Sequence, residues 1–442
     1  MIAIKSFTGI EIAFAGDYLC YHAENNDGNR SHIVGSVVYE NKIDGKDFIN
    51  KMKQRAFMHP HYEKLKMNLY IKELFFLFMI PYWKKYDRFN IDDHFELITK
   101  KLETDQELYD LTADHLSFND FQPEKPKWKM YLYENFKEGK SVLVMKIHHS
   151  YADGISSLSY FMNLTDCSEF EMVKLKKIGK LEWVVAVTLG FFKIVITYYY
   201  FLTWKKDLNC FHTGKITGKK RLYSVEACAL DEYKKAAKTH DVTINDSLTA
   251  ILSMSLHKYC KEKYNENIES ILAMIPVSLR PLPKPGEFYP IDNFCSLIYT
   301  QLPIKHDENV FTITKFYRKY MNNLTNSYDI YVSKLAYEIM PYILTPSFLR
   351  GIVRFIANKV SFVFSNVPGP KNQLVSFGKY RVEKIISSVN IFSDTLVVFS
   401  IITYNNKIYL TCISDQEINF CPKEFIEIFS EYLKKDILGK KN

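Results

Sequence analysis

The sequence predicts a chain of mixed α/β structure with more than one lobe or domain. At 442 residues the chain is about three times as long as a typical domain, which favours two domains or one large two-lobed unit. Helix and strand patterns alternate along the chain without an internal repeat. Hydrophobic residues make up 47% and aromatic residues 15% of the chain, so a fully folded chain with a large core is expected.

The first well-defined element is a buried strand that leads into a helix. Residues 141 to 147, SVLVMKI, form a short β-branched apolar run, as expected for a buried strand. Behind it, apolar residues recur at the spacing of one helix face, namely Ile155, Leu158, Phe161 and Met162. We therefore expect His148 and His149 at the end of a strand, with Asp153 and Gly154 opening the helix.

Three further elements follow towards the C-terminus. The pattern INDSLTAILSMSLHKYCKEKY predicts a helix that begins near Asn245 or Asp246, either of which is a suitable N-cap. The apolar runs LVVFSIITY and KIYLTCIS flank Asn405 and Asn406, a pair that favours a tight hairpin turn. The final pattern, KEFIEIFSEYLKK, predicts an amphipathic helix.

Two apolar segments raise the question of membrane contact. Residues 181 to 204 exceed the roughly 20 residues that cross a bilayer, and Trp183 and Trp204 lie where interfacial aromatic residues are found. Lys193, near the centre, costs about 2.5–3.5 kcal/mol on insertion. We therefore expect a helix that lies in the interface or packs on protein. The segment at 73 to 83 is too short to span a bilayer and is predicted to be a core helix.

Composition excludes several classes of function. The net charge of +8 is modest and spread along the chain, so nucleic acid is not an expected partner. Basic residues would suit an anionic membrane surface, a phosphate-bearing molecule such as coenzyme A, or an ordinary solvated surface. The eight cysteines form no CxxC pair, which argues against a metal site and for reduced thiols. Lys5 and Glu11 interrupt the N-terminal apolar run, so we expect no cleaved signal peptide and a cytosolic active site.

The adjacent histidines are the main candidates for chemistry. Neighbouring strand residues point to opposite faces, so only one of His148 and His149 can face a given cleft. An imidazole at a strand end suits a general base, because its ordinary pKa of about 6.5 leaves it largely neutral at cellular pH. Asp153 either orients the imidazole or pairs with a distant arginine and holds the turn. Gly154 would let the backbone pass close to substrate. A hydrogen-bonded structural histidine is the alternative.

The motif at these histidines has a known counterpart. The string HHxxxDG resembles the active-site motif of the coenzyme A-dependent acyltransferases, which include chloramphenicol acetyltransferase and peptide-synthetase condensation domains. Four segments narrow the resemblance to the wax ester synthase/diacylglycerol acyltransferase family: KPKWKMYLYENF is similar to its PLW segment, TINDSLTA to its ND motif, IPVSLRP to its PVSLRP segment and SNVPGP to its NVPGP motif. Lys127 replaces the family's leucine, and Asp292 stands where the family usually has glycine.

The resemblance implies a chloramphenicol acetyltransferase-like fold. Each of its two lobes would be a mixed sheet with helices, and an active-site tunnel would run between the lobes. The implied catalytic motif consists of His148, His149, Asp153 and Gly154, with His149 as the general base. Arg280 is the implied ion-pair partner of Asp153, which makes Asp153 a structural residue.

The other shared motifs imply supporting roles. Asn245 and Asp246 resemble fold-stabilising residues at the contact between the lobes. Ser365, Asn366 and Gly369 belong to the NVPGP-like loop and would line the substrate tunnel. Ser365 or Asn366 would serve as an oxyanion donor.

The implied function is O-acyl transfer. A long acyl chain would pass from acyl-CoA, a substrate and not a resident cofactor, to a fatty alcohol or to diacylglycerol, giving a wax ester or triacylglycerol. One alternative is a carrier-protein-dependent condensation enzyme, although the chain shows no carrier module. Another is a non-catalytic, membrane-associated lipid-binding protein of the same fold, which the intact motif argues against.

The implied organisation has three parts. Residues 1 to 178 would form the N-terminal lobe, 179 to 214 a hydrophobic linker helix and 215 to 442 the C-terminal lobe. A single membrane crossing by the linker would place His149 and Arg280 on opposite sides of the bilayer, so we expect it to dip into one leaflet. The expected partner is a membrane surface or lipid droplet. The expected location is the cytosolic face of the endoplasmic reticulum or another internal or plasma membrane.

Overall fold

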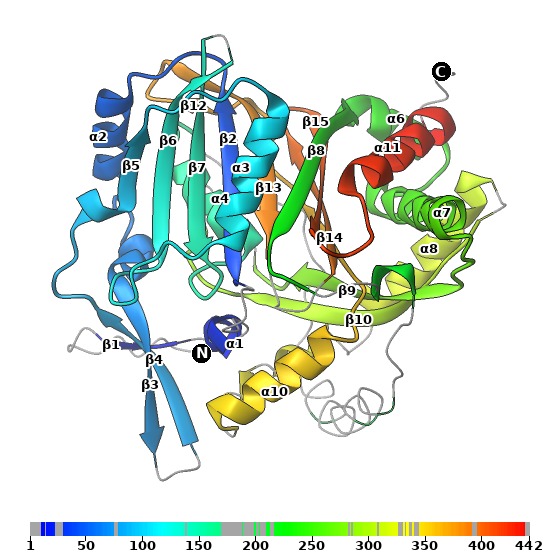
Figure 1. Ribbon diagram of the computed structural model, residues 1–442, viewed down its shortest axis with the longest axis horizontal. Helices are drawn as coiled ribbons and strands as arrows, with labels where there is room; N and C mark the ends of the chain where they lie inside the picture. The colour runs from blue at the N-terminus through cyan, green and yellow to red at the C-terminus, as the bar shows by residue number, and fades with distance from the viewer. Residues whose placement is uncertain are drawn as a thin grey trace.

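Two six-stranded sheets form the two lobes of the molecule, and a three-stranded sheet extends from the first lobe (Figure 1). The computed structural model describes residues 10–13, 15–22, 30–74, 78–137, 139–168, 188, 199, 203, 209–212, 216–281, 283, 286–306, 309–325, 330–331, 333–335, 338–339, 344–390 and 396–437. The described part is therefore a mixed α/β protein, as the alternating patterns predict.

The sheet of the first lobe contains the strand that carries the histidines. Its order is β12 (Val375–Ser376), β13 (Tyr380–Val389), β2 (His32–Tyr39), β7 (Lys140–His148), β6 (Trp128–Phe136) and β5 (Phe95–Ile98). Neighbouring strands are antiparallel except β5 and β6, which are parallel. Helices α2 (Gly45–Arg55) and α4 (Gly154–Asn163) cover one face of this sheet, and α3 (Asp105–Ser117) covers the other. The strand β7 and the helix α4 confirm the predicted strand-to-helix transition.

Two strands of this sheet come from the distant end of the chain. β13 pairs with β2 over almost its full length, from Val382 opposite Tyr39 to Val389 opposite Ile33. The predicted division at 178 and 215 therefore does not follow sheet membership, because residues 375 to 389 complete the first lobe. The apolar face of β13 packs with β2 and β7, and this burial outweighs proximity along the chain.

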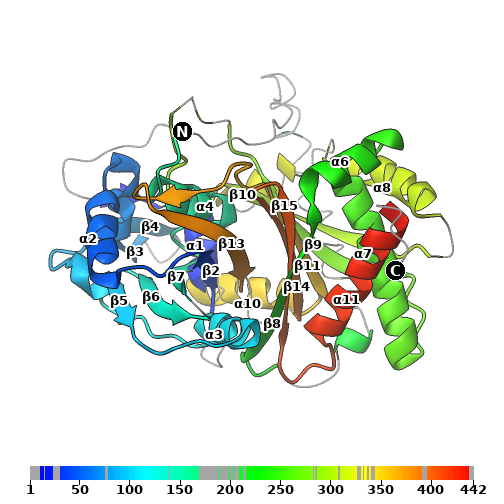
Figure 2. The same ribbon diagram turned by 90° about the horizontal axis from the view of Figure 1, so that it is seen from above.

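The second lobe is also built on a six-stranded sheet. Its sheet has the order β10 (Cys295–Pro303), β9 (Ser270–Ser278), β11 (Phe362–Val367), β14 (Val397–Tyr404), β15 (Lys407–Asp415) and β8 (Lys220–Ala229). The helices α6 (Leu230–Thr239), α7 (Ile244–Tyr264), α8 (Val310–Thr325) and α11 (Pro422–Tyr432) gather on its outer side (Figure 2). Asn405 and Asn406 form the turn between β14 and β15, both with positive φ, which confirms the predicted hairpin. The amphipathic helix predicted from KEFIEIFSEYLKK is confirmed as α11.

The lobes join through a buried apolar cluster. Side chains of α3, β2, β6 and β7 meet side chains of β8, β9, β11, β14 and β15 in this cluster. The Tyr109 hydroxyl of α3 donates to the Ser224 carbonyl of β8 at 2.5 Å. Since α3 packs on both sheets, the lobes are held in a fixed relation around the space between them.

The prediction of a core helix at 73 to 83 is wrong. The described residues of this region belong to β3 (Met67–Leu74) and β4 (Phe78–Lys85), which pair with each other and project from the body (Figure 1). The strand β4 also pairs with β1 (Ile10–Ile12). Pro81 explains the difference, because a proline has no N–H and disrupts a helix interior. In β4 it lies opposite Ile71, and its carbonyl accepts a hydrogen bond from the Ala13 N–H.

The predicted N-cap of α7 is displaced by two or three residues. The cap is Thr243, whose hydroxyl accepts from the Asp246 N–H at 3.2 Å. The Asp246 carboxylate accepts in return from the Thr243 N–H, which completes a capping box. Asp246 is therefore the third residue of the helix, and Asn245 lies within its first turn.

The apolar segment at 181 to 204 lies outside the described residues, apart from three isolated positions, so its expected contact with a membrane stays a prediction. The remaining helices include α1 (Ala15–His22), α10 (Pro346–Ala357) and the short turns at Pro60–Lys66, Ile91–His94, Cys210–His212 and Leu433–Ile437. Within the described ranges, no helix combines the length and apolar character needed to cross a bilayer.

Candidate active site

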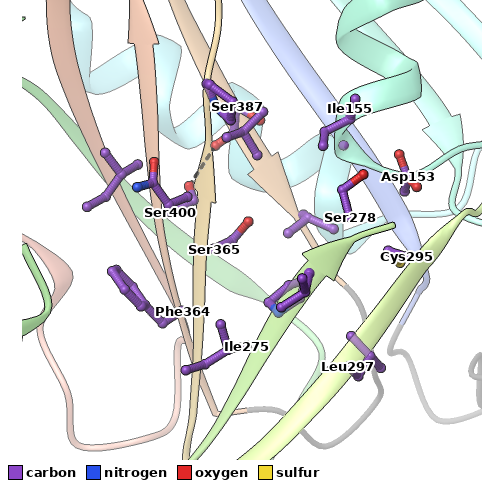
Figure 3. A pocket seen from close by; sticks show the side chains of 18 of the residues that line it. Asp153, Ile155, Ile275, Ser278, Cys295, Leu297, Phe364, Ser365, Ser387 and Ser400 are labelled. Atoms are coloured by element: carbon purple, nitrogen blue, oxygen red, sulfur yellow. Dashed lines mark hydrogen bonds between the residues drawn. The ribbon is translucent and has the colours of Figure 1, made fainter. Parts of the chain in front are cut away.

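A cavity of about 800 Å³ lies between the lobes. His149, Asp153 and Gly154 of the first lobe form part of its wall. Strands β9 and β11 of the second lobe contribute apolar side chains that include Ile275 and Phe364, shown in Figure 3. A volume of several hundred cubic ångströms is typical of pockets that enclose a small molecule. His149, Asp153 and Gly154 of the predicted motif therefore face a mostly apolar space between the lobes.

His149 is held at the cavity wall by one side of its ring. His149 directly follows β7 and is 6% exposed. Its backbone N–H donates to the Ser31 carbonyl at 2.8 Å. Its Nδ1 lies 3.1 Å from Asn293 Oδ1 and 3.5 Å from Cys20 Sγ. Within the described chain no hydrogen bond reaches Nε2. Nε2 is therefore the ring nitrogen that is left to act on a bound molecule.

The surroundings of Asn293 determine which nitrogen of His149 carries the proton. Asn293 Nδ2 lies 2.7 Å from the His149 carbonyl oxygen, 3.0 Å from Asp17 Oδ1 and 3.2 Å from the Ser150 carbonyl oxygen. All three oxygens accept hydrogen bonds, so the NH₂ group faces them and Oδ1 faces the imidazole. Since Oδ1 can only accept, Nδ1 is the protonated nitrogen and Nε2 keeps its lone pair. This is the tautomer that a general base requires.

Burial keeps His149 neutral. It lowers the pKa of the imidazole below its ordinary value, because an imidazolium is poorly solvated there; the residue's own carbonyl and Asp153 oppose the effect. Burial also raises the pKa of the neighbouring Cys20 thiol, and the nearby Cys295 and Asp17 raise it further. Cys20 is therefore a neutral thiol, and the imidazole is the base of the site.

His148 has a structural position. It is the last residue of β7, is fully buried and does not line the cavity. Its Nδ1 accepts from the Ser150 N–H at 3.0 Å, and its ring lies against those of His32 and Tyr21. The expectation that only one histidine of the pair faces the cleft is confirmed.

Asp153 is occupied on both carboxylate oxygens. It is the N-cap of α4, and its Oδ1 accepts from the Ser156 N–H at 3.0 Å. Its Oδ2 accepts from Arg280 Nη1 and from the Phe294 N–H, the latter at 3.1 Å. The predicted ion pair between Asp153 and Arg280 is thus present, and of the two interpretations the structure favours the one in which Asp153 holds the turn.

Arg280 also binds a second carboxylate. Its Nη2 donates to Asp292 Oδ1 and, at 2.7 Å, to the Asp292 carbonyl. Burial alone would raise the pKa of Asp153, but Arg280 and the Ser156 N–H outweigh it and hold that pKa below the ordinary value. Burial dominates at Asp292 and raises its pKa although Arg280 opposes this. Of the two acids, Asp292 therefore takes up a proton first as the pH falls.

The two residues that depart from the family pattern make defined contacts. The Asp292 carbonyl accepts from the Asp153 N–H at 3.1 Å and from the Ser156 hydroxyl at 2.9 Å. Lys127 is half-buried, and its ammonium lies 4.6 Å from the centre of the Tyr21 ring. The backbone carbonyl of Asp292 therefore helps to hold the motif loop, and the Lys127 ammonium packs on Tyr21.

Asn245 and Asp246 play different parts from each other. Asn245 lines the cavity, and its Oδ1 accepts from Asn366 Nδ2 at 3.2 Å. Since α7 and β11 both belong to the second lobe, this hydrogen bond lies within that lobe and not between the lobes as expected. Asp246 is buried in the capping box of α7, which agrees with a stabilising role.

The NVPGP-like segment lines the cavity as expected. Ser365 and Asn366 of β11 and the following Gly369 all belong to the wall, and Figure 3 shows Ser365 beside Ser400 and Phe364. A Cβ atom at Gly369 would lie 2.1 Å from the Thr403 carbonyl oxygen, so only glycine fits there. A Cβ atom at Gly154 would meet only Val367, at 3.8 Å, so the protein itself leaves room for a side chain there.

Sequence reasoning missed the residues that contact the imidazole. Asn293 and Cys20 touch Nδ1 of His149, and Asp17 touches Asn293. Cys20 and Asp17 lie far from the histidines in sequence and belong to no recognised motif. The only available signal was the position of Asn293 directly after Asp292, where the chain departs from the family pattern.

Comparisons with known proteins agree with this site and fold. A family profile described as the wax ester synthase/diacylglycerol acyltransferase catalytic domain matches residues 18 to 176, which include the histidine motif. A second profile, the WS/DGAT C-terminal domain, matches residues 291 to 435. The chain belongs to the wax ester synthase/diacylglycerol acyltransferase family. This confirms the resemblance on which the site assignment rests.

Members of this family from bacteria and plants are similar over most of the chain. O-acyltransferase WSD of Acinetobacter baylyi is 22% identical over 66% of this chain and 69% of its own length. Wax ester synthase/diacylglycerol acyltransferase 4 of Arabidopsis thaliana is 21% identical over 94% of this chain and 87% of its own. The solved wax ester synthase/diacylglycerol acyltransferase of Marinobacter aquaeolei VT8 superposes with a TM-score of 0.64 at 18% identity, covering 96% of this chain and 98% of that one.

The fold is also shared with condensation domains. The first condensation domain of the calcium-dependent antibiotic synthetase gives a TM-score of 0.63 at 11% identity, with 96% of each chain covered. The predicted chloramphenicol acetyltransferase-like fold is confirmed. At this level of identity the likeness shows the fold alone.

Proposed function

We propose that the protein transfers a long acyl chain from acyl-CoA to the hydroxyl of a fatty alcohol or of diacylglycerol, with His149 as the general base. The observation that carries the proposal is a buried, neutral imidazole whose Nε2 keeps its lone pair at the wall of an apolar cavity between the lobes. The names of its relatives, wax ester synthase, O-acyltransferase and diacylglycerol acyltransferase, support the same reaction.

The proposed reaction is one acyl transfer in which His149 carries the proton. Nε2 takes the proton of the acceptor hydroxyl, and the hydroxyl oxygen attacks the thioester carbonyl. The tetrahedral intermediate expels the coenzyme A thiolate, which takes the proton back from the imidazolium and leaves as a thiol. The ester is the second product, and His149 is neutral again. The Ser365 hydroxyl, on the same cavity wall, is our candidate donor to the oxyanion.

The lining of the cavity suits both parts of an acyl-CoA substrate. Apolar side chains of β9, β10, β11 and α10 would surround an acyl chain. Two exposed lysines, Lys234 and Lys371, also belong to the wall and so lie at its opening, where they would attract coenzyme A phosphates. The proposed reaction requires no resident cofactor, because acyl-CoA is itself consumed.

We also propose that the protein works at a membrane or lipid-droplet surface on the cytosolic side, such as the cytosolic face of the endoplasmic reticulum. Its proposed acceptors are lipids, and the apolar run at 181 to 204 would provide contact with one leaflet. Phe348 and Phe355 of α10, which are 57% and 41% exposed, add apolar surface beside the cavity wall formed by Ile352 and Val353.

An acceptor panel tests the reaction. Purified protein would be incubated with labelled palmitoyl-CoA and, separately, fatty alcohols, diacylglycerol and water. We expect ester from one or both lipid acceptors, and no ester from the His149→Ala variant because no other group at the site is placed to take the proton. His61→Ala, a change of an exposed histidine, is the control and should leave turnover intact.

The outcomes separate the three candidate functions. Ester formation that requires His149 supports the proposal. Normal turnover by a folded His149→Ala variant contradicts the assigned base. Binding of palmitoyl-CoA without any product would favour a lipid-binding protein, and product only with a carrier-bound acyl group would favour a condensation enzyme.

Protease protection tests the membrane proposal. In sealed microsomes both lobes should be digested from the cytosolic side, because His149 and Arg280 belong to one site. Protection of one lobe alone would contradict the dipping linker and the shared site together. A fully soluble fraction in flotation would contradict the membrane partner only.

A further inference from the structure

A second buried carboxylate lies close to His149. Asp17 is fully buried, and its Oδ1 accepts from Asn293 Nδ2 at 3.0 Å. Its Oδ2 accepts from Lys64 Nζ at 2.8 Å and from Trp83 Nε1 at 2.9 Å. Both oxygens of Asp17 therefore have donors, and one of those donors is the amide that contacts the imidazole.

The helix α1 approaches Asn293 unusually closely. A Cβ atom at Gly16 would lie 2.9 Å from the Asn293 carbonyl oxygen and 3.0 Å from Asn293 Cβ. Only a glycine allows this approach, because a methyl group at that distance would push the helix away. Gly16 thereby lets the next residue, Asp17, reach the Asn293 side chain.

The hydrogen bonds form a continuous chain from a buried cation to the base. Lys64 donates to Asp17, Asp17 accepts from the Asn293 NH₂ group, and Asn293 Oδ1 accepts from Nδ1–H of His149. Each link fixes the direction of the next, since the carboxylate can only accept and the amide has one accepting end. Asp153 takes no part, because its two oxygens are bound by Ser156, Arg280 and Phe294.

We propose that Asp17 is the positioning carboxylate of this site, acting through Asn293 to hold His149 in the tautomer that leaves Nε2 free to take a proton. This inference rests on the proposed function, because the tautomer matters only if His149 is a base. It assigns the orienting role to a carboxylate on α1 that lies outside the histidine motif. Its negative charge also favours the imidazolium that forms during transfer.

The test replaces Asp17 with its neutral isostere. In Asp17→Asn, the new amide must turn its oxygen to Lys64 and Trp83, so its NH₂ group would face the NH₂ group of Asn293. The Asn293 NH₂ group would then lose one of its three acceptors and face another NH₂ group, while the His149 and Ser150 carbonyl oxygens still accept from it, so the preference for a proton on Nδ1 weakens. We expect ¹⁵N-histidine NMR to show His149 protonated at Nδ1 in the wild type and as a mixture of the Nδ1–H and Nε2–H tautomers in the variant. The kcat should fall about tenfold or more, with KM for palmitoyl-CoA little changed.

Trp83→Phe is the matched control. It removes one hydrogen bond to the same carboxylate, at Oδ2, but leaves the contact between Oδ1 and Asn293. It should lower the melting temperature yet keep the Nδ1–H tautomer and most of kcat. His149→Gln identifies the His149 signals in the spectrum.

The outcomes are distinguishable. If Asp17→Asn keeps the Nδ1–H tautomer, or loses no more kcat than Trp83→Phe, Asp17 stabilises the fold only and the inference is overturned. A shift of the proton towards Nε2 together with a lowered kcat supports it. If the wild type makes no ester with any acceptor, the proposed function fails, whereas the NMR comparison still decides whether Asp17 sets the tautomer.

Discussion

Two buried charge clusters flank His149, and they hold different parts of the site. The Arg280 cluster, formed by Arg280, Asp153 and Asp292, binds the backbone of the motif loop and the start of α4. The Asp17 cluster, formed by Asp17, Lys64 and Trp83, binds the amide that contacts the imidazole. The first cluster holds the loop in place, and the second reaches the ring.

Closeness in sequence does not determine which carboxylate acts on the His149 ring. Asp153 is only four residues from His149, yet its carboxylate is directed to Arg280 and backbone N–H groups. Asp17 lies on another element, yet it is one amide away from the ring. We therefore expect changes in the Arg280 cluster to act mainly on stability and a change of the Asp17 carboxylate to act mainly on catalysis.

The largest effect should come from Arg280→Ala. The change would leave the carboxylates of Asp153 and Asp292 buried without their cation, which costs about 3–5 kcal/mol of unfolding free energy. Denaturant unfolding would measure this loss. Arg280→Lys keeps the charge but not the two-armed geometry and should lose less. An unchanged unfolding free energy in Arg280→Ala would show that this cluster does not stabilise the motif loop.

A smaller loss is expected from Asp153→Asn. Arg280 keeps Asp292 as a partner, so we expect about 2–3 kcal/mol of destabilisation at pH 7 together with lower activity. The lowered pKa of Asp153 means that its stabilisation is present above the unfolded pKa and is lost as the pH falls through the folded one. The difference in melting temperature should therefore shrink in acid. A variant with normal stability but no activity would assign Asp153 the orienting role instead.

The pH dependence of turnover reports the protonation state of His149. Activity requires neutral His149, and burial places the pKa of this residue below its ordinary value of about 6.5. We expect kcat/KM for palmitoyl-CoA to be flat from about pH 8 to below 6.5, and then to fall about tenfold per pH unit. An acid limb that begins above pH 6.5 would contradict the buried, neutral imidazole.

The smallest effect should come from Asp292→Asn. Burial raises the pKa of Asp292, so its ionised form is disfavoured in the folded protein, and Arg280 retains Asp153 as its counter-ion. The backbone carbonyl that binds Asp153 and Ser156 is unchanged. We expect a change of about 1 kcal/mol or less in denaturant unfolding. A loss as large as that of Asp153→Asn would show that the two acids share the cation equally.

Local patterns in the sequence were sufficient to predict several helices and strands and one hairpin turn. The apolar run before His148 and the helical spacing after Gly154 define β7 and α4, because both depend on neighbouring residues. The turn at Asn405 is equally local. The pair of Asp153 and Arg280 was expected only through the family motifs, because residues 127 positions apart leave no periodic signal.

Long-range contacts account for what the sequence did not predict. The strands β3 and β4 contain long aromatic and apolar runs that fit a helix or a strand equally well, and Pro81 was the only local sign against a helix. Asn293 contacts His149 across 144 positions, and Asp17 contacts Asn293 across 276. Such contacts depend on how α1 packs against the loop before β10, which no local pattern encodes.

The strand β13 has a consequence for the order in which the protein folds during synthesis. It borders β2, and the Ser388 hydroxyl donates to the Val34 carbonyl at 2.7 Å across 354 positions. Strands β2, β7, β6 and β5 can pair early, but the open edge of β2 stays unpaired until the ribosome has passed residue 389. Closing so long a loop is slow, and an unpaired edge attracts other strands. Until β13 is made, the first lobe of the nascent chain therefore exposes the edge of β2, to which a strand of another chain can pair.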